Sequence, residues 1–474
     1  MHLHDLDRFI DCVHTERGGF FAAPRPLVVA RAPARLDVLG GTAADSGSLV
    51  LQLPLAVATY AALQPDPEPI LRIMWRRHNA ADLYAEVPLA ALMPGGNPVT
   101  YAHARMHIAQ WLTRLEPSDS DGSRWYAALI GCWIALMREE FVRFPGGARL
   151  LIASDVPPGV TAPVEVAVMQ ALAAAYNGHI APRELALHCQ TVTKQLGGTS
   201  SSVIDPLTAM CGSANHLIAL RCQPGSIVDN LHMPHGVAVW GIVSGELAAL
   251  SARAYNAARV GAAMGYRIIA EIEGLVTNQH GQLVQIRDTR WGGYLANLLP
   301  SEYTHRFRDQ LPLSMRGDHF IAQYGGLSDT VADIDPAYTY AIREPTEHPI
   351  YEHLRVRHVS ALLAVANHET TRDEALRLIG ELMAQSHQSH HACGLGSPGA
   401  EGLVELVHAA GVAHGLYGAR RTDGGMVVIL GRSDAGKAVQ TLVEHYTAAS
   451  GHAAHSVSGS SPGGAASGVC WIDP

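Results

Sequence analysis

The sequence predicts an α+β fold of at least two domains, and three observations support this prediction. The chain has 474 residues, of which 48% are hydrophobic and 16% charged, so it can bury a large core and divide into two or three domains. Strand and helix patterns alternate irregularly, which favours α+β over a doubly wound sheet. A second region of strand followed by long helices begins near Val237.

The first region is rich in short apolar runs that read as strands. A leading helix and a turn at Gly18-Gly19 occupy residues 1–25. We expect strands at 27–30, 48–53, 56–63, 71–75 and 149–153, with Pro54 separating the second from the third and a turn following the first. Helices are predicted at 126–144 and 164–176.

The second region contains the longest helical patterns. Its strands are expected at 237–242 and 424–430, and its helices at 252–273, 353–367, 371–387 and 434–450. Residues 452–468 are rich in Gly, Ser and Ala, which predicts a mobile tail or a loop leading into a last strand at 469–472.

Charge and composition exclude several classes of protein. The formal net charge is -9, unlike the basic footprint of a nucleic-acid binder. The apolar runs are too short to span a bilayer, and the N-terminus lacks the pattern of a signal peptide. Seven dispersed cysteines suit reduced thiols. We therefore expect a cytoplasmic protein with neither nucleic acid nor membrane as partner, of undetermined oligomeric state.

The stretch Arg31-Ala-Pro-Ala-Arg-Leu-Asp-Val-Leu-Gly-Gly41, with seven further collinear stretches, resembles the GHMP small-molecule kinases, in the form seen in L-arabinokinases and galactokinases. The further stretches are 205–215, 222–224, 240–242, 259–265, 345–352, 392–397 and 459–463. The resemblance implies a domain like the second domain of ribosomal protein S5 at 26–220. It also implies a ferredoxin-like domain at 221–464, with the active site between them and a tail at 452–474.

The same resemblance places the first motif in a sugar pocket. Arg35 would lie near the reacting hydroxyl, and Asp37, Gly40 and Gly41 would belong to the pocket. The downstream sugar-holding Asp of the family is replaced here by Ala44, and Asp45 follows one position later. The alternative is a strand and turn in which Arg35 and Asp37 form a structural pair.

Asp205 matches the family's catalytic Asp, which acts as a general base or orients the substrate hydroxyl. The alternative is a helix N-cap, a position that Asp favours. Residues 199–202, Thr-Ser-Ser-Ser, replace the usual Ala-Pro-Cys-Gly, so that Ser201 and Ser202 would change the wall of the sugar pocket. Tyr255 aligns near a sugar-contacting Tyr of galactokinases, or else is a buried aromatic at a helix start.

The phosphate-binding loop departs most from the family pattern. Gly159 and Thr161 remain, but the serine run of the relatives is missing and the loop is about four residues shorter. Pro163 has no N–H to offer a phosphate. It suits the first position of a helix, so that a plain helix entry is the favoured interpretation.

Two other nucleotide motifs are altered as well. Thr193 stands twelve residues before Asp205, where the relatives carry a magnesium-binding Glu, and a hydroxyl replaces a carboxylate poorly at a hard dication. The third glycine turn is reduced to Gly424 and Gly425. Asp423 before them would repel phosphate. An ordinary Asp-Gly turn explains the same residues.

His387, His390 and His391 have the i, i+3, i+4 spacing that could place them on one helix face. Zinc suits such ligands. A helix C-terminus also favours histidine electrostatically, and no carboxylate is near in the sequence, so no metal site is assigned.

These observations predict a GHMP-fold protein that binds a monosaccharide or sugar-like metabolite but has lost or remodelled ATP·Mg²⁺ phosphotransfer. It would be a pseudokinase, or a nucleotide-free acid–base enzyme using Asp205 together with a neighbouring His or Arg35, with no cofactor. The alternative is an active sugar 1-kinase that uses ATP and Mg²⁺ through unconventional contacts. A third class, a scaffold, would bind neither ligand. Nucleotide affinity separates the first two, and the sequence does not identify the sugar.

Overall fold

A computed structural model describes residues 3–77, 81–112, 120–140, 142–176, 178–196, 202–246, 249–280, 283–328, 333–422 and 425–473. The chain forms two compact units that are discontinuous in sequence. The first unit comprises residues 1–35, 54–214 and 460–474, and the second comprises 36–53 and 215–459. The sequence instead suggests contiguous domains meeting near residue 220. The difference arises because β1 (Leu27–Leu39) and β2 (Leu49–Asp66) each run through both units.

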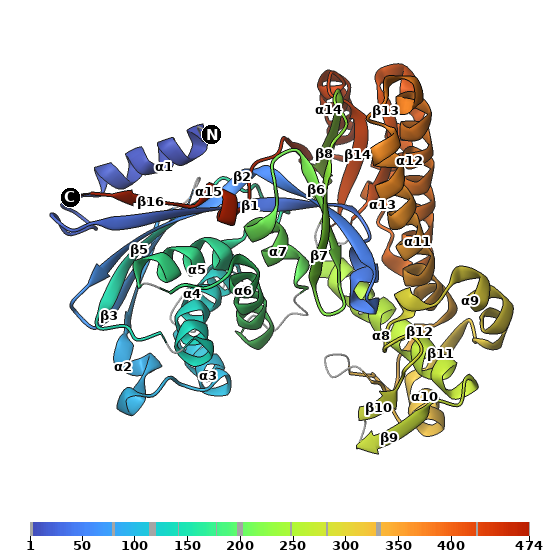
Figure 1. Ribbon diagram of the computed structural model, residues 1–474, viewed down its shortest axis with the longest axis horizontal. Helices are drawn as coiled ribbons and strands as arrows, with labels where there is room; N and C mark the ends of the chain where they lie inside the picture. Colours follow the sequence, from blue (N-terminus) through green and yellow to red (C-terminus); the bar gives the residue numbers. More distant parts are fainter. Residues whose placement is uncertain are drawn as a thin grey trace. The chain divides into compact units, whose positions relative to one another are not determined.

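The first unit is a sheet with helices on both faces. Its strand order is β16-β1-β2-β5-β3-β4. Helix α1 lies on one face, and α4, α5 and α6 lie on the other (Figure 1). The remaining elements of this unit are α1 (His4–Thr15), β3 (Ile70–Arg76), β4 (Leu83–Pro88), α2 (Leu89–Leu92), η2 (Pro94–Gly96), α3 (Tyr101–Leu112), α4 (Ser120–Glu139), β5 (Gly147–Ser154), α5 (Val164–Ala175), α6 (Pro182–Leu196), α7 (Ile204–Cys211), α15 (Gly464–Ser467) and β16 (Val469–Ile472).

The second unit is built on an antiparallel sheet of order β13-β14-β8-β15, and long helices α11 and α12 run side by side next to it (Figure 1). Its core includes Trp240, Ile242 and Ile429. The elements are η1 (Gly41–Ser46), β6 (His216–Arg221), β7 (Ser226–His232), β8 (Val237–Val243), α8 (Ala249–Ile272), β9 (Val276–His280), β10 (Leu283–Arg287), η3 (Leu295–Asn297), α9 (Pro300–Arg306), η4 (Arg308–Gln310), β11 (Ser314–Arg316), α10 (Gly317–Tyr324), β12 (Thr339–Ala341), α11 (Arg343–Val365), α12 (Glu369–His390), η5 (His391–Leu395), α13 (Pro398–Ala410), η6 (Val412–His414), β13 (Leu416–Arg421), β14 (Met426–Arg432), α14 (Gly436–Ser450) and β15 (His455–Ser458).

Four expectations about local structure were wrong. The motif after Ala30 is strand, because β1 is buried along nearly its whole length and so lacks an alternating pattern. Strand β2 continues through Pro54. Residues 49–52 of this strand pair with β6 and residues 59–66 pair with β5, so Pro54 lies between the two paired segments. Helix α11 begins ten residues early, at Arg343, and contains Pro349. The tail contains β15 and α15.

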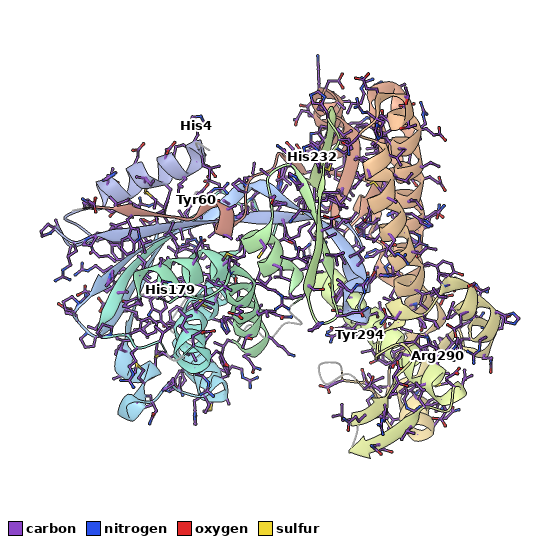
Figure 2. The ribbon with its side chains drawn as sticks, in the orientation of Figure 1. His4, Tyr60, His179, His232, Arg290 and Tyr294 are labelled. Atoms are coloured by element: carbon purple, nitrogen blue, oxygen red, sulfur yellow. The ribbon has the colours of Figure 1, made fainter. Side chains whose placement is uncertain are left out.

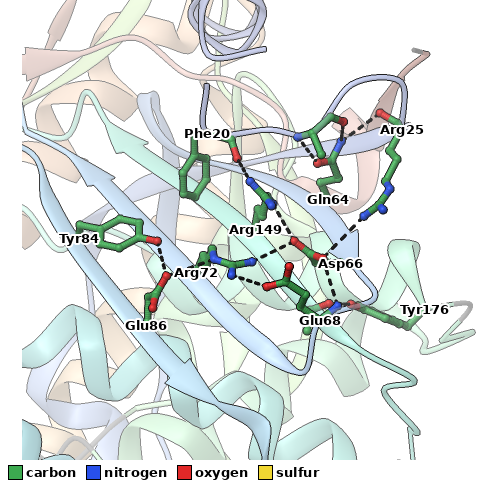
Figure 3. Close-up of polar contacts among 12 residues, drawn as sticks. Phe20, Arg25, Gln64, Asp66, Glu68, Arg72, Tyr84, Glu86, Arg149 and Tyr176 are labelled. Carbon is green, nitrogen blue, oxygen red and sulfur yellow. Dashed lines mark hydrogen bonds and ion pairs between the residues drawn. The ribbon is translucent and has the colours of Figure 1, made fainter. Parts of the chain in front are cut away.

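A network around Asp66 fixes the turn between β2 and β3 in the first unit (Figure 3). The Asp66 carboxylate accepts hydrogen bonds from Arg149 Nε (2.7 Å) and Arg72 NH1 (3.2 Å), and Arg25 lies 3.6 Å away. Burial alone would raise the pKa of Asp66, but the hydrogen bonds from Arg149 and from the Glu68 backbone lower it. The network is a structural clamp.

The helices and the cysteines bear on the classes of protein that the sequence excluded. Among the described residues, none of the helices combines the length and the apolar character needed to cross a bilayer. All seven cysteines lie in the described part of the chain, and each is a free thiol.

Candidate functional site

The first motif ends in a tight corner that requires glycine. Strand β1 stops at Leu39, and Gly40 follows with a φ of +109°. A β-carbon at Gly40 would lie 2.7 Å from Val50, so a side chain is excluded by space as well as by backbone conformation. The corner leads into the 3₁₀ turn η1, which closes at Gly47 against the ring of Tyr294. Tyr294 is labelled in Figure 2.

Asp37 holds this corner from inside. Its side chain is 4% exposed and pairs with Arg420 NH1 at 3.0 Å. It also accepts hydrogen bonds from Gln52 Nε2 (2.8 Å) and from the Gly41 backbone N–H (3.3 Å). Asp37, predicted to bind substrate, is therefore part of a buried ion pair, and the suggested pairing of Arg35 with Asp37 does not form.

Arg35 pairs instead with Asp205, the other residue predicted to be catalytic. Arg35 Nε donates to the Asp205 carboxylate, and both side chains are partly exposed, at 23% and 38%. Asp205 is the second residue of α7, whose N-cap is Val203, so the N-cap alternative was wrong. Ser202 Oγ accepts from the Ile204 N–H at 3.3 Å. Ser201 lies outside the described residues.

A cavity of about 270 Å³ lies in the second unit. Turn η1 contributes three polar side chains to its wall, and α8 and α11 contribute most of the rest. The lining residues are Thr42, Asp45, Ser46, Tyr255, Ala258, Arg259, Ala262, Ala263, Tyr266, Gly293, Leu295, Ser328, Pro345, His348, Pro349, Cys393 and Leu395. Polar and apolar side chains share this lining about equally, and a concave site with convergent polar groups is typical of small-molecule sites.

Two predicted sugar residues, Asp45 and Tyr255, meet at this cavity. The Tyr255 hydroxyl donates to Asp45 Oδ2 at 2.7 Å, and Arg259 Nε lies 3.6 Å from the same oxygen. Asp45 and Arg259 therefore balance each other's charge at the wall. Arg259 was not predicted as a site residue, although it begins the stretch 259–265 that resembles the family.

His348 and Thr42 also line the cavity and were not predicted. His348 Nε2 lies 3.2 Å from Thr42 Oγ1, and its Nδ1 lies 2.9 Å from Ser389 Oγ. Burial lowers the pKa of His348 to about 4, so the ring is neutral at pH 7.

Behind His348 lies Glu352, whose side chain is fully buried. It accepts hydrogen bonds from Ser386 Oγ (2.6 Å) and Arg355 NH1 (2.9 Å). Burial would raise the pKa of Glu352, but His348, which is protonated in the acid range where Glu352 titrates, and the charges of Arg355 and Arg420 lower it to about 2. We call Glu352, His348, Arg355, Ser386, Arg420 and Asp37 the Glu352 network.

The three clustered histidines divide between two environments. His387 Nε2 and His391 Nδ1 lie 2.8 and 3.1 Å from the two oxygens of Glu401, on α13. His390 is buried, and its ring centroid lies 6.1 Å from that of His348. The three do not share one face, and among the described residues no group of three or more His, Cys, Asp or Glu side chains is arranged to hold a metal ion.

The residues predicted to face nucleotide form short turns. Gly159 has a φ of +84°, the Val160 N–H donates to the Pro157 carbonyl at 3.2 Å, and Thr161 is exposed. Pro163 is the N-cap of α5, one residue before the predicted position. Gly425 has a φ of +79°, and its N–H donates to the Thr422 carbonyl at 3.1 Å. Gly424 and Asp423 lie outside the described residues.

Thr193 has a carboxylate beside it that the sequence analysis missed. Thr193 Oγ1 donates to Glu165 Oε1, from the first turn of α5, at 3.2 Å. Mg²⁺ is usually held by one or two carboxylates together with substrate phosphates and water. Glu165 and Thr193 are therefore a donor set that fits nucleotide-bound Mg²⁺. A contact across 28 sequence positions has no local signature, which is why no motif indicated it.

No family model matches the sequence, but characterised relatives do. The L-arabinokinase of Arabidopsis thaliana is 36% identical over 501 residues, which cover 94% of this chain and 47% of that protein. The galactokinase of Roseiflexus sp. is 27% identical, covering 49% of this chain and 53% of that protein. That of Chloroflexus aggregans is 26% identical, covering 86% and 83%. The chain thus spans about half the length of the first two.

Solved structures share the fold. The galactokinase of Lactococcus lactis, in complex with galactose, superimposes with a TM-score of 0.69 at 16% identity, covering 96% of this chain and 99% of that one. The mevalonate kinase of Methanococcus jannaschii gives a TM-score of 0.53 at 12% identity, covering 91% and 96%. The predicted two-domain α+β fold is confirmed.

Proposed function

Because the chain belongs to the GHMP kinase superfamily, as a protein similar to L-arabinokinase and galactokinase, we propose that it is an active, ATP- and Mg²⁺-dependent sugar 1-kinase. The observation that carries the proposal is the cavity of the second unit, where Asp45 and Tyr255 meet with Thr42, Arg259 and His348. Hydroxyl, carboxylate and guanidinium groups in one small cavity suit a polyhydroxylated ligand.

The Arg35–Asp205 pair supplies the acid–base chemistry in this proposal. The anomeric hydroxyl of the sugar gives its proton to an Asp205 oxygen while its own oxygen bonds to the γ-phosphorus of ATP, and ADP leaves. Arg35 orients the carboxylate through its hydrogen bond.

The shortened phosphate loop led the sequence analysis to favour a pseudokinase, and we now place the working kinase first. The relatives named above are kinases, and Glu165 with Thr193 offers an oxygen donor set for nucleotide-bound Mg²⁺. When bound, Mg²⁺ neutralises charge on the transferred phosphoryl group. The backbone of 157–164, in the same unit as Glu165 and Thr193, would contact the phosphates.

The test is phosphoryl transfer from ATP·Mg²⁺ to L-arabinose and D-galactose, with calorimetry of ATP·Mg²⁺ binding. We expect phosphorylated sugar from the wild-type protein and a decrease of about 10²- to 10⁴-fold in kcat for Asp205→Asn, since that is the usual contribution of general acid–base catalysis. Asp309→Asn, at a side chain 88% exposed, is the matched control. Sugar binding without any ATP binding would instead establish the pseudokinase or the nucleotide-free enzyme.

A further inference from the structure

Within the cavity, His348 stands out because three elements fix its ring. It lies on α11, its Nε2 reaches Thr42 of η1, and its Nδ1 reaches Ser389 of α12. Both ring nitrogens therefore have partners, and rotation of the ring would break both contacts. The ring is only 3% exposed although it lines the cavity, so it acts mainly through the groups it contacts.

We propose that His348 is a positioning residue that fixes the Thr42 hydroxyl as a recognition group for one hydroxyl of an uncharged sugar. This inference rests on the proposed function, because it takes the cavity to be the sugar site. It assigns to this chain a specificity determinant, His348, that acts through Thr42.

The hydrogen-bonding roles follow from the neutral ring. A neutral imidazole donates from one nitrogen and accepts at the other. If Nε2 donates, the Thr42 oxygen accepts from His348 and the hydroxyl proton is left for the ligand. If Nε2 accepts, Thr42 donates to His348 and its oxygen lone pairs are left for the ligand. In either tautomer the Thr42 hydroxyl is fixed as either a donor or an acceptor toward the ligand, whereas a freely rotating hydroxyl could be both.

The charges at the wall favour an uncharged ligand. Among the described residues that line the cavity, Asp45 and Arg259 are the permanently charged side chains, and they pair with each other. The Glu352 network behind His348 also balances internally, with Glu352 and Asp37 facing Arg355 and Arg420. A uronic acid or sugar phosphate would bring a charge without a partner into this cavity, and burying such a charge is costly.

The experiment measures sugar affinity without nucleotide, so it is independent of phosphoryl transfer. The probes are D-galactose, L-arabinose, their monodeoxy derivatives and D-galacturonate, titrated by calorimetry. A site that hydrogen-bonds a ligand hydroxyl rejects the analogue that lacks it, because polar groups are left unpaired. For the wild type we expect one deoxy position to weaken binding about 10- to 100-fold, and D-galacturonate to bind more weakly than D-galactose.

The variants separate recognition from folding. Thr42→Val keeps the shape and removes the hydroxyl, so it should bind the parent sugar about 10- to 100-fold more weakly and should no longer distinguish it from that deoxy sugar. His348→Leu should lose the same discrimination. Combined with Thr42→Val it should add little, because the two residues act as one unit. His348→Gln, whose amide can replace Nε2 at Thr42, should restore part of the discrimination. His305→Gln, at an exposed position of α9, is the control.

The outcomes distinguish this inference from the proposed function. No binding of either parent sugar by the wild-type protein overturns the proposed function and the inference with it. Wild-type binding that Thr42→Val leaves unchanged, with the deoxy discrimination intact, overturns the inference alone. If His348→Leu fails to fold, as a thermal scan would reveal, Thr42→Val and His348→Gln still decide the question.

Discussion

The Asp66 network of the first unit and the Glu352 network of the second each surround a carboxylate with arginines, but only the second includes a histidine. Around Asp66 the partners are Arg25, Arg72 and Arg149, which stay charged at every relevant pH. Glu352 instead lies beside His348, which reaches the cavity. One network clamps a turn, whereas the other connects the unit's interior to a candidate ligand site.

The difference indicates which of the two networks is close to a functional site. A cluster of ion pairs at the turn between β2 and β3 needs only to hold neighbouring strands together. A buried cluster with a neutral imidazole keeps a group that can donate or accept a hydrogen bond next to a cavity, and perturbed titratable groups in a cavity are indicators of functional sites. Mutation, acid and metal binding each test this difference between the two units.

Removing the central carboxylate should affect the second unit most. Glu352→Gln leaves Arg355 without its buried negative partner, and breaking a buried ion pair costs about 3–5 kcal/mol of unfolding free energy. Asp66→Asn is the matched change in the first unit. Its arginines reach solvent or other carboxylates, so we expect about 1–3 kcal/mol.

Urea unfolding monitored by circular dichroism measures both variants. Sugar affinity should also decrease in Glu352→Gln, through His348, and remain unchanged in Asp66→Asn. Equal losses of stability, with sugar affinity intact in both, would show that the two networks are equivalent clamps.

Acid should destabilise the second unit before the first. Burial lowers the pKa of His348 to about 4 and that of His390 to about 3, below the value of about 6.5 expected in the unfolded chain. Between pH 6.5 and 4 the unfolded chain takes up these protons and the folded unit does not, so unfolding free energy falls as pH falls, by on the order of a few kcal/mol. Asp66, with a lowered pKa, loses its contribution only below about pH 4.

Urea titrations at pH 7, 6, 5 and 4.5 measure this slope. The double variant His348→Gln/His390→Gln should reduce it, since neither replacement titrates in that range, while His353, whose pKa burial lowers to about 4, keeps part of the slope. A slope that the double variant leaves unchanged would assign the acid sensitivity to other groups.

The sequence predicted periodic elements better than contacts. The strands at 71–75 and 149–153 and the helix at 434–450 were close, because their apolar patterns are local. The length of β1 was predicted wrongly because the strand is buried on both faces and has no alternating pattern. Pro54 was predicted to end a strand because the gap between the two pairing registers of β2 has no local signature.

The same limit applies to the site. Asp45 and Tyr255, and Arg35 and Asp205, were assigned from motif resemblance and do meet in the structure. His348 lies 306 positions from its partner Thr42, and no pattern of composition or spacing reports such a contact. Asp37 shows the converse: a motif residue whose buried partner, Arg420, is 383 positions away.

Glu165 is a carboxylate outside both networks, and its replacement should have the smallest of the three effects. Its hydrogen bond to Thr193 places it in neither clamp nor cavity, so Glu165→Gln should leave sugar affinity unchanged and stability nearly so. Loss of one carboxylate ligand should weaken Mn²⁺·ATP binding about 10-fold, within the range seen when metal-site groups are changed. Electron paramagnetic resonance of bound Mn²⁺ measures this without turnover. Glu184→Gln, at an exposed position of α6, is the control. If Glu165→Gln binds Mn²⁺·ATP as tightly as the wild type does, Glu165 is not a metal ligand. The pseudokinase would then be the favoured interpretation.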